Sequence, residues 1–260
     1  MPLIVPESAL QAADAFGDGD GVTVLGGGTI VMPEITYGRL RPDRVLMLAH
    51  AGLDEMSGNG TLMIGATVPV QALVDRAPEP LASAARGVAD LEVRSQGTIA
   101  GNLCAPPGAE GPRGDLQAPL IALGARVRSV GTGGERHEGV EDFLAAGPRG
   151  RLVLAIEVDA PRRGAFVSLG RPHANAYTTL SVSCAETADG IRVAAGGVAP
   201  RGVRLPSVEA ALGAGAGPAE AAARAGDDVR PADDALASAW YRDRVLPVLV
   251  TRALTNLQGA

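Results

Sequence analysis

The alternation of apolar and polar residues divides the first part of the chain into short strands and helices. Val22–Leu25 is an apolar run that ends at three consecutive glycines, which is typical of a buried strand followed by a tight turn. Residues 30–37 then have helical spacing, and residues 45–48 predict a second strand. The further predicted elements are a hairpin over 53–56 and 62–64, helices over 70–76 and 80–89, a hairpin over 126–130 and 135–139, a helix over 140–144 and a strand over 152–158.

The pattern changes near residue 160. Residues 165–169, 178–184 and 191–198 predict three antiparallel strands. Residues 233–257 have apolar positions at helical spacing and predict one long amphipathic helix. Its apolar positions are Leu236, Trp240, Val245, Leu249, Ala253 and Leu257. The chain is therefore predicted to be α+β, with one domain over residues 1–160 and a smaller one over 161–260 that contains a three-stranded antiparallel sheet and helices.

Composition narrows the classes of partner. Hydrophobic residues form 46% of the 260-residue chain but aromatic residues only 3%, so the core must be aliphatic. The net charge of −6 and the scattered arginines argue against a nucleic-acid partner. No apolar run approaches the ~18 residues of a membrane span. The N-terminus lacks the features of a signal peptide, so we expect a cytoplasmic protein.

The sequence predicts neither a metal site nor catalytic residues. Cys104 and Cys184 suggest no disulfide framework, and the three histidines are too widely spaced for zinc or iron–sulfur ligation. The absence of lysine excludes a Walker A site and a lysine nucleophile. No Gly-x-Ser-x-Gly elbow supports serine hydrolysis. We expect Cys104 to be a small buried filler and His173 a surface residue, whereas Tyr177 either stacks near a cofactor or packs in the core.

Gly26, Gly27 and Gly28 form the first candidate binding turn. Glycine lets backbone N–H groups approach an anion closely, and the start of a helix adds partial positive charge. The triplet does not match the Rossmann pattern, because Val31 stands where a third glycine is required. Taken alone, it is either a phosphate-binding turn or an ordinary turn.

Residues 97–118 are rich in glycine and proline and predict a long irregular loop. Near its start, residues 98–102 combine a hydroxyl, bare backbone and an amide, which suit a diphosphate and a ribityl chain. Asp115 follows on the same loop, where its carboxylate can accept hydrogen bonds from polyol hydroxyls. The alternatives are a glycine-rich loop that caps a core and an aspartate that caps the helix after it.

Together the two segments resemble a known family. Leu25–Thr29 and Thr98–Asn102 look like the two FAD-binding signatures of molybdenum hydroxylase flavoprotein subunits, such as the medium subunit of aerobic carbon monoxide dehydrogenase and the flavin domain of xanthine dehydrogenase. Residues 114–125 continue the resemblance, which extends over nearly the whole chain. It implies a two-part FAD-binding domain of the vanillyl-oxidase (PCMH) type, with parts at about 1–50 and 51–160. A C-terminal domain of the carbon monoxide dehydrogenase flavoprotein type would follow.

The resemblance also implies the cofactor site. Residues 24–32 and 98–102 would hold the diphosphate and adenosine ends, Asp115 would meet the ribityl chain, and Leu154 would lie near the flavin ring. The implied cofactor-binding residues are Leu25, Gly26, Gly27, Gly28, Thr29, Ile30, Val88, Thr98, Ala100, Gly101, Asn102, Asp115 and Leu154. We expect non-covalent FAD, since no cysteine or histidine stands at an attachment position of the family. Gly27→Val is expected to abolish flavin binding with little loss of fold.

The function implied by the resemblance is electron transfer through FAD. Electrons would pass from an iron–sulfur small subunit to FAD and on to an external acceptor. The molybdenum cofactor and the iron–sulfur clusters would lie only in partner subunits, the former in a large subunit. Two alternatives remain open: a free-standing FAD oxidase or dehydrogenase with its own small substrate, and a non-catalytic structural subunit that has lost FAD.

Overall fold

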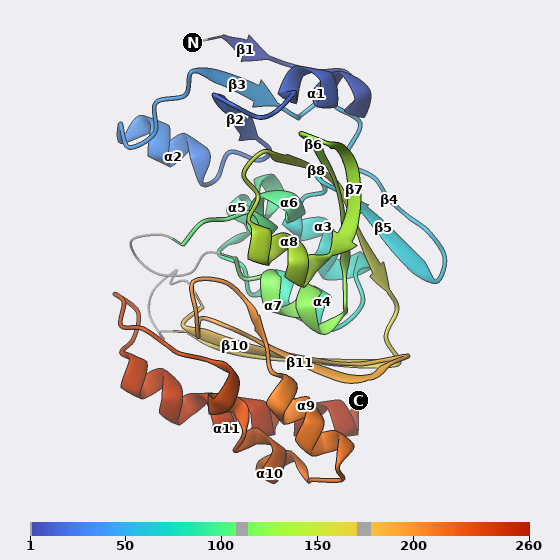
Figure 1. Cartoon of the computed structure of the whole chain (residues 1–260), viewed down its shortest axis with the longest axis vertical. Coiled ribbons are helices and arrows are strands. Elements are labelled where there is room, and N and C mark those ends of the chain that lie inside the picture. Colours follow the sequence, from blue (N-terminus) through green and yellow to red (C-terminus); the bar gives the residue numbers. More distant parts are fainter. Residues whose placement is uncertain (1, 108–113, 171–177) are drawn as a thin grey trace. The chain divides into compact units, whose positions relative to one another are not determined.

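The computed structural model describes residues 2–107, 114–170 and 178–260 (Figure 1). The chain folds into two compact units that interleave along the sequence. Unit 1 comprises residues 1–72, 91–105 and 125–158, and unit 2 comprises residues 73–90, 106–124 and 159–260. His173 and Tyr177, for which the sequence offered expectations, lie outside the described residues.

Unit 1 begins with a three-stranded parallel sheet in the order β1-β3-β2. Its elements are β1 (Leu3–Ile4), α1 (Ala9–Phe16), β2 (Val22–Leu25), α2 (Val31–Thr36) and β3 (Arg44–Met47). The side chain of Ser8 caps α1 by accepting the N–H of Gln11. β2 has the predicted bounds, and α2 and β3 lie within one residue of the prediction.

Unit 1 also contains a five-stranded sheet in the order β4-β5-β8-β6-β7. Its strands are β4 (Met56–Ser57), β5 (Thr61–Gly65), β6 (Arg126–Gly131), β7 (Gly134–Gly139) and β8 (Arg151–Asp159). Both predicted hairpins are present, although β4 shares only Met56 with the strand predicted over 53–56. The strand register between β6 and β8 shifts at Arg128 and Ser129, so Leu154 has no opposite residue on β6. Such a bulge changes the direction in which a side chain points.

The short helices of unit 1 are α5 (Leu91–Gln96), α6 (Ile99–Leu103) and α8 (Val140–Ala146), and the first three residues of α3 (Val70–Arg76) also belong to it. The prediction of an irregular segment over residues 97–118 is therefore wrong at both ends, because it contains α6 and the start of a further helix. A helix of five residues is too short to show periodicity in the sequence. Its signal is the cap, since the side chain of Thr98 accepts the N–H of Gly101.

Unit 2 is built on a four-stranded antiparallel sheet in the order β12-β11-β10-β9. Its strands are β9 (Arg163–Leu169), β10 (Leu180–Thr187), β11 (Gly190–Gly196) and β12 (Val203–Arg204). The three predicted strands are confirmed, and β12 adds a fourth. Two residues carry no alternation by themselves, so only the pairing with β11 identifies β12 as a strand.

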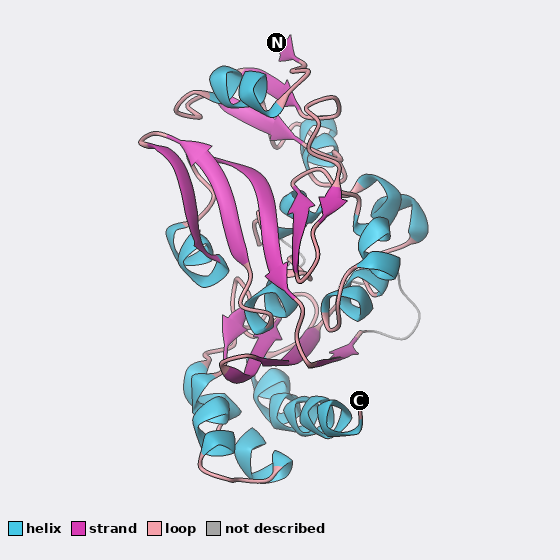
Figure 2. Cartoon of the chain, turned by 90° about the vertical axis from the view of Figure 1, so that its right-hand side faces the viewer, coloured by secondary structure: helices cyan, strands magenta, loops and turns pink. Residues whose placement is uncertain are grey.

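Helices cover both faces of this sheet (Figures 1 and 2). Against one face lie α9 (Pro206–Gly213), α10 (Pro218–Ala222), the 3₁₀-helix η1 (Ala225–Asp228) and α11 (Ala239–Gly259). Against the other lie α4 (Leu81–Arg86) and α7 (Gln117–Ala122). The residues of α7 are all buried between its neighbours. This helix begins two residues after Asp115, so the sheet of unit 2 supports the turn on which Asp115 lies.

The long C-terminal helix starts six residues later than predicted. Ser238 caps α11 by accepting the N–H of Tyr241. Leu249, Ala253 and Leu257 are buried as expected, but Trp240 is 66% exposed and was wrongly predicted to face the core. Within the described ranges, no helix combines the length and the apolar character needed to cross a bilayer.

Candidate functional site

The first candidate turn follows the parallel strand β2. Gly26, Gly27 and Gly28 connect β2 to α2, and Gly28 has a φ of +74°, which favours glycine. The carbonyl of Gly28 accepts the N–H of Met32 at 2.9 Å, which joins the turn to the first residues of α2. The turn is only partly exposed to solvent. This is the strand–turn–helix arrangement that the glycine triplet predicted.

Unused backbone donors distinguish this turn from an ordinary one. In the described part of the chain, the N–H groups of residues 26–30 have no backbone or side-chain acceptor. Buried or partly buried N–H groups are usually paired, so a run of unpaired ones is a cradle for an acceptor that comes from outside the chain. A diphosphate supplies such acceptors, and the start of α2 adds partial positive charge. The turn therefore fits the phosphate portion of FAD.

The second candidate segment packs directly against this turn. A side chain at Gly26 would meet the Oγ1 atom of Thr98 at 2.8 Å. A Cβ atom at Gly27 would lie 1.7 Å from the carbonyl oxygen of Gln96, which is a severe overlap with backbone. The structure thus brings the two sequence motifs together. It also corrects the expectation that Gly27→Val spares the fold, because Gly27 is needed for protein packing as well as for any ligand.

The two motifs differ in what they offer a ligand. The N–H of Ile99 donates to the carbonyl of Val68 at 3.0 Å, and the N–H of Ala100 donates to the carbonyl of Ala66 at 3.2 Å. The next two N–H groups, of Gly101 and Asn102, donate to the side chain and the carbonyl of Thr98. The start of α6 therefore has its backbone donors occupied. This segment can contribute side chains to a cofactor, whereas backbone donors come from residues 26–30.

Leu154 belongs to the same neighbourhood. Its carbonyl accepts the N–H of Ala66 at 3.0 Å, and the carbonyl of Ala66 accepts the N–H of Ala100. Ala66 thereby links the bulge on β8 to the second motif, a role for which the sequence gives no signal. Within unit 1 the predicted residues of both motifs and Leu154 are close together.

Asp115 and Val88 belong to unit 2. Burial raises the pKa of Asp115 from 3.8 to about 6, while a hydrogen bond from the Thr178 side chain opposes this rise. Val88 is buried and follows Gly87, the C-cap residue of α4. The residue after it, Ala89, has a φ of +41°, the only positive value among the described non-glycine residues. A strained backbone and a carboxyl with a raised pKa are both features of functional sites.

Cys104 offers no reactive thiolate. Burial raises the pKa of Cys104 to about 12, so the thiol stays protonated at neutral pH. Among the residues that the structure describes, no group of three or more His, Cys, Asp and Glu side chains could hold a metal ion.

These features define a class: a protein whose backbone cradles an anionic cofactor at a turn between a parallel strand and a helix. The family described as "FAD binding domain in molybdopterin dehydrogenase" matches residues 1–161, and "CO dehydrogenase flavoprotein C-terminal domain" matches residues 170–257. The chain belongs to this FAD-binding flavoprotein family of the molybdopterin dehydrogenases. The resemblance inferred from the two glycine motifs and the predicted fold class are thereby confirmed.

Known relatives cover most of the chain. It is 28% identical to the glyceraldehyde dehydrogenase medium chain of Sulfolobus acidocaldarius, over 97% of each chain. It is 32% identical to the uncharacterized protein YgfM of Escherichia coli, over 78% of this chain and 75% of that one. A solved carbon monoxide dehydrogenase of Hydrogenophaga pseudoflava, which lacks the Mo-pyranopterin moiety of its cofactor, has the same fold. Its TM-score is 0.86 at 24% identity, over 100% of this chain and 97% of that one.

Proposed function

We propose that this chain is the FAD-binding electron-transfer subunit of a molybdenum-dependent hydroxylase or dehydrogenase. It takes electrons from an iron–sulfur small subunit and delivers them to an external acceptor, while a large subunit carries the molybdenum cofactor. The observation that carries the proposal is the run of unpaired N–H groups at residues 26–30. Family membership and the medium-chain relative support it.

The proposed site uses each residue according to its chemistry. Backbone N–H groups from Gly26 to Ile30 bind the diphosphate, and Thr98 contributes its hydroxyl. Asp115 accepts hydrogen bonds from the ribityl hydroxyls, Val88 contributes an apolar contact, and Leu154 lies against the flavin ring. The remaining proposed contacts are Leu25, Ala100, Gly101 and Asn102. Bound FAD supplies the redox chemistry, and the protein supplies binding, orientation and exclusion of water.

The domain boundaries and the location of the protein are part of the proposal. We assign residues 1–160 to the FAD-binding domain, with parts at about 1–50 and 51–160, and residues 161–260 to the C-terminal domain. The change in sequence pattern near residue 160 and the two matched ranges support this division. We place the protein in the cytoplasm.

Flavin analysis of the purified full chain tests the proposal. We expect a yellow protein that releases FAD into the supernatant on acid precipitation, because non-covalent contacts alone hold the cofactor. Chromatography identifies the released flavin. FMN in place of FAD, flavin retained in the pellet, or a chain that binds no FAD after reconstitution would contradict the proposal.

A further inference from the structure

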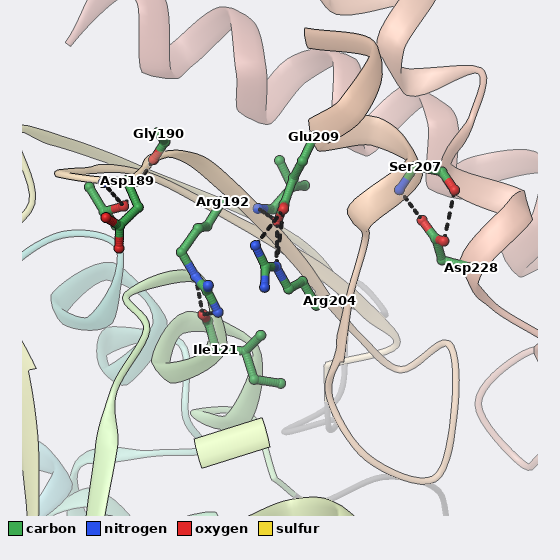
Figure 3. Close-up of polar contacts among 10 residues, drawn as sticks. Ile121, Asp189, Gly190, Arg192, Arg204, Ser207, Glu209 and Asp228 are labelled. Atoms are coloured by element: carbon green, nitrogen blue, oxygen red, sulfur yellow. Dashed lines mark hydrogen bonds and ion pairs between the residues drawn. The ribbon is translucent and has the colours of Figure 1, made fainter. Parts of the chain in front are cut away.

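The short helix α7 is held at both ends by the sheet of unit 2. At its first residue, the Oε1 atom of Gln117 accepts the N–H of Gly202 at 2.8 Å. At the other end, the Nε and Nη2 atoms of Arg192 donate to the carbonyl of Ile121 at 3.1 and 3.0 Å (Figure 3). Arg192 belongs to β11, and Gly202 lies just before β12. The sheet therefore fixes both the position of α7 along its axis and its rotation.

The packing around these contacts leaves little freedom. A side chain at Gly202 would approach the Cβ atom of Gln117 to 2.9 Å and the backbone nitrogen of Ala118 to 3.0 Å. Gln117 is buried, so its amide group has little room for another rotamer. The guanidinium of Arg192 presents two donors in a rigid fork to one carbonyl oxygen, which fixes direction as well as distance.

Asp115 lies on the turn that leads into this helix. Only Leu116 separates Asp115 from Gln117, and the N–H of Gln117 donates to Gly114 at 3.1 Å. Because the turn and the helix form one short hydrogen-bonded segment, a displacement of α7 moves the carboxyl group of Asp115 with it. A hydrogen bond to a cofactor tolerates only small changes in distance and angle.

We propose that Arg192 and Gln117 are positioning residues for FAD binding, which hold α7 against the C-terminal sheet and thereby place Asp115. This inference rests on the proposed function, since it assumes that Asp115 contacts the cofactor. It assigns a part in cofactor binding to Arg192 of β11, a strand of the C-terminal sheet.

The test compares Arg192→Leu with a matched control, Arg204→Leu. Arg204 is also half-buried on this sheet, but its guanidinium pairs with Glu209 of α9 at 2.8 Å (Figure 3). Both variants remove an arginine from the same sheet. FAD is titrated into the flavin-free full chain, and the melting temperature of the flavin-free form is measured alongside. We expect Arg192→Leu to raise the dissociation constant of FAD roughly ten-fold, within the ten- to hundred-fold range for a hydrogen bond to a charged group. Arg204→Leu should leave it within about two-fold.

A double-mutant cycle separates positioning from general destabilisation. In an Asp115→Ala background, Arg192→Leu should change the dissociation constant by less than about two-fold, because the group that it positions is gone. Arg192→Lys, which keeps the charge but not the fork, should give an intermediate constant and serves if the leucine variant fails to fold. Gln117→Leu should weaken FAD in the same way as Arg192→Leu.

An equal weakening of FAD with and without Asp115 would overturn the inference, as would an equal effect of Arg204→Leu. Unchanged FAD affinity in both Arg192 variants would also overturn the inference. In that case the wild type would still bind FAD, so the proposed function would stand. A wild-type chain that binds no FAD would overturn the proposed function and this inference with it.

Discussion

At the scale of single residues, glycine serves two purposes in the candidate site. Gly28 adopts a left-handed backbone conformation, as expected of a tight turn. Gly27 instead leaves room for the backbone carbonyl of Gln96, so the absence of a side chain at this position serves protein packing. The same sequence triplet therefore combines a folding requirement with unpaired N–H groups that form the candidate binding surface.

The proposed contact between Asp115 and the cofactor predicts that FAD binding depends on pH. Its pKa of about 6 in the folded flavin-free chain means that it is charged above pH 6 and protonated below it. If only the carboxylate binds the ribityl hydroxyls, the dissociation constant of FAD should rise roughly ten-fold from pH 7 to pH 5, because only the charged fraction is competent to bind. Titration of FAD into the flavin-free chain across this range measures the effect.

Asp115→Asn is the control for this prediction. An amide does not titrate, so the dissociation constant of FAD for this variant should be nearly the same at pH 5 and pH 7. Because the folded pKa of Asp115 lies above its ordinary 3.8, the flavin-free wild type should lose stability as the pH rises from about 4 through 6. If the FAD affinity of the wild type and that of Asp115→Asn had the same pH profile, Asp115 would not be part of the site.

At the scale of elements, exposure decides which side of a helix contributes to stability. The sequence predicted one apolar face on α11 that included Trp240. In the structure, the buried face of α11 consists of the residues that pack in the core of unit 2. These are Leu246, Leu249, Val250, Ala253, Leu254 and Leu257. Trp240 lies outside this set, with the guanidinium of Arg244 5.6 Å from its ring centre.

The two faces of α11 should respond differently to truncation. Leu249 is 1% exposed, so Leu249→Ala should lower the free energy of unfolding by about 2–5 kcal/mol through the cavity that it leaves. Trp240→Ala should lower it by less than about 1 kcal/mol, since it removes only a partly exposed cation–π contact. Urea unfolding of both variants measures the difference, and similar losses would show that Trp240 is buried in solution.

At the scale of the whole molecule, the described residues supply a cofactor cradle but no metal-binding cluster. The proposed function is that of a subunit that relays electrons between partners. The two alternatives from the sequence, a free-standing flavin oxidase and a structural subunit without flavin, differ from it in what the isolated chain does.

Anaerobic flavin spectra separate these functions. We expect small aldehydes and purines to leave the flavin absorbance of the isolated full chain unchanged, because the chain takes its electrons from a partner. In the complex purified through a tag on this chain, the substrate of the assembly should bleach the flavin. Bleaching of the isolated chain would favour the free-standing enzyme, and a complex without flavin would favour the structural subunit.

The sequence by itself determined the family, the fold class and most elements of secondary structure. Two glycine-containing motifs in a fixed order identified the FAD-binding family, and local apolar runs predicted β2, α3 and the hairpins because these elements form from neighbours in the chain. Short elements escaped this reasoning: α6 has too few residues for a period, and β12 is defined only by its partner strand.

Only the tertiary structure decided how the candidate site is built. Whether an N–H group is free depends on acceptors from distant segments. The carbonyl groups of Val68 and Ala66 accept the N–H groups of Ile99 and Ala100, whereas the N–H groups of residues 26–30 meet no acceptor in the described chain. The close approach of Gly27 to Gln96 and the contact of Arg192 with Ile121 likewise join positions about seventy residues apart. A local pattern cannot specify such contacts, because they depend on how the elements pack rather than on the residues beside them.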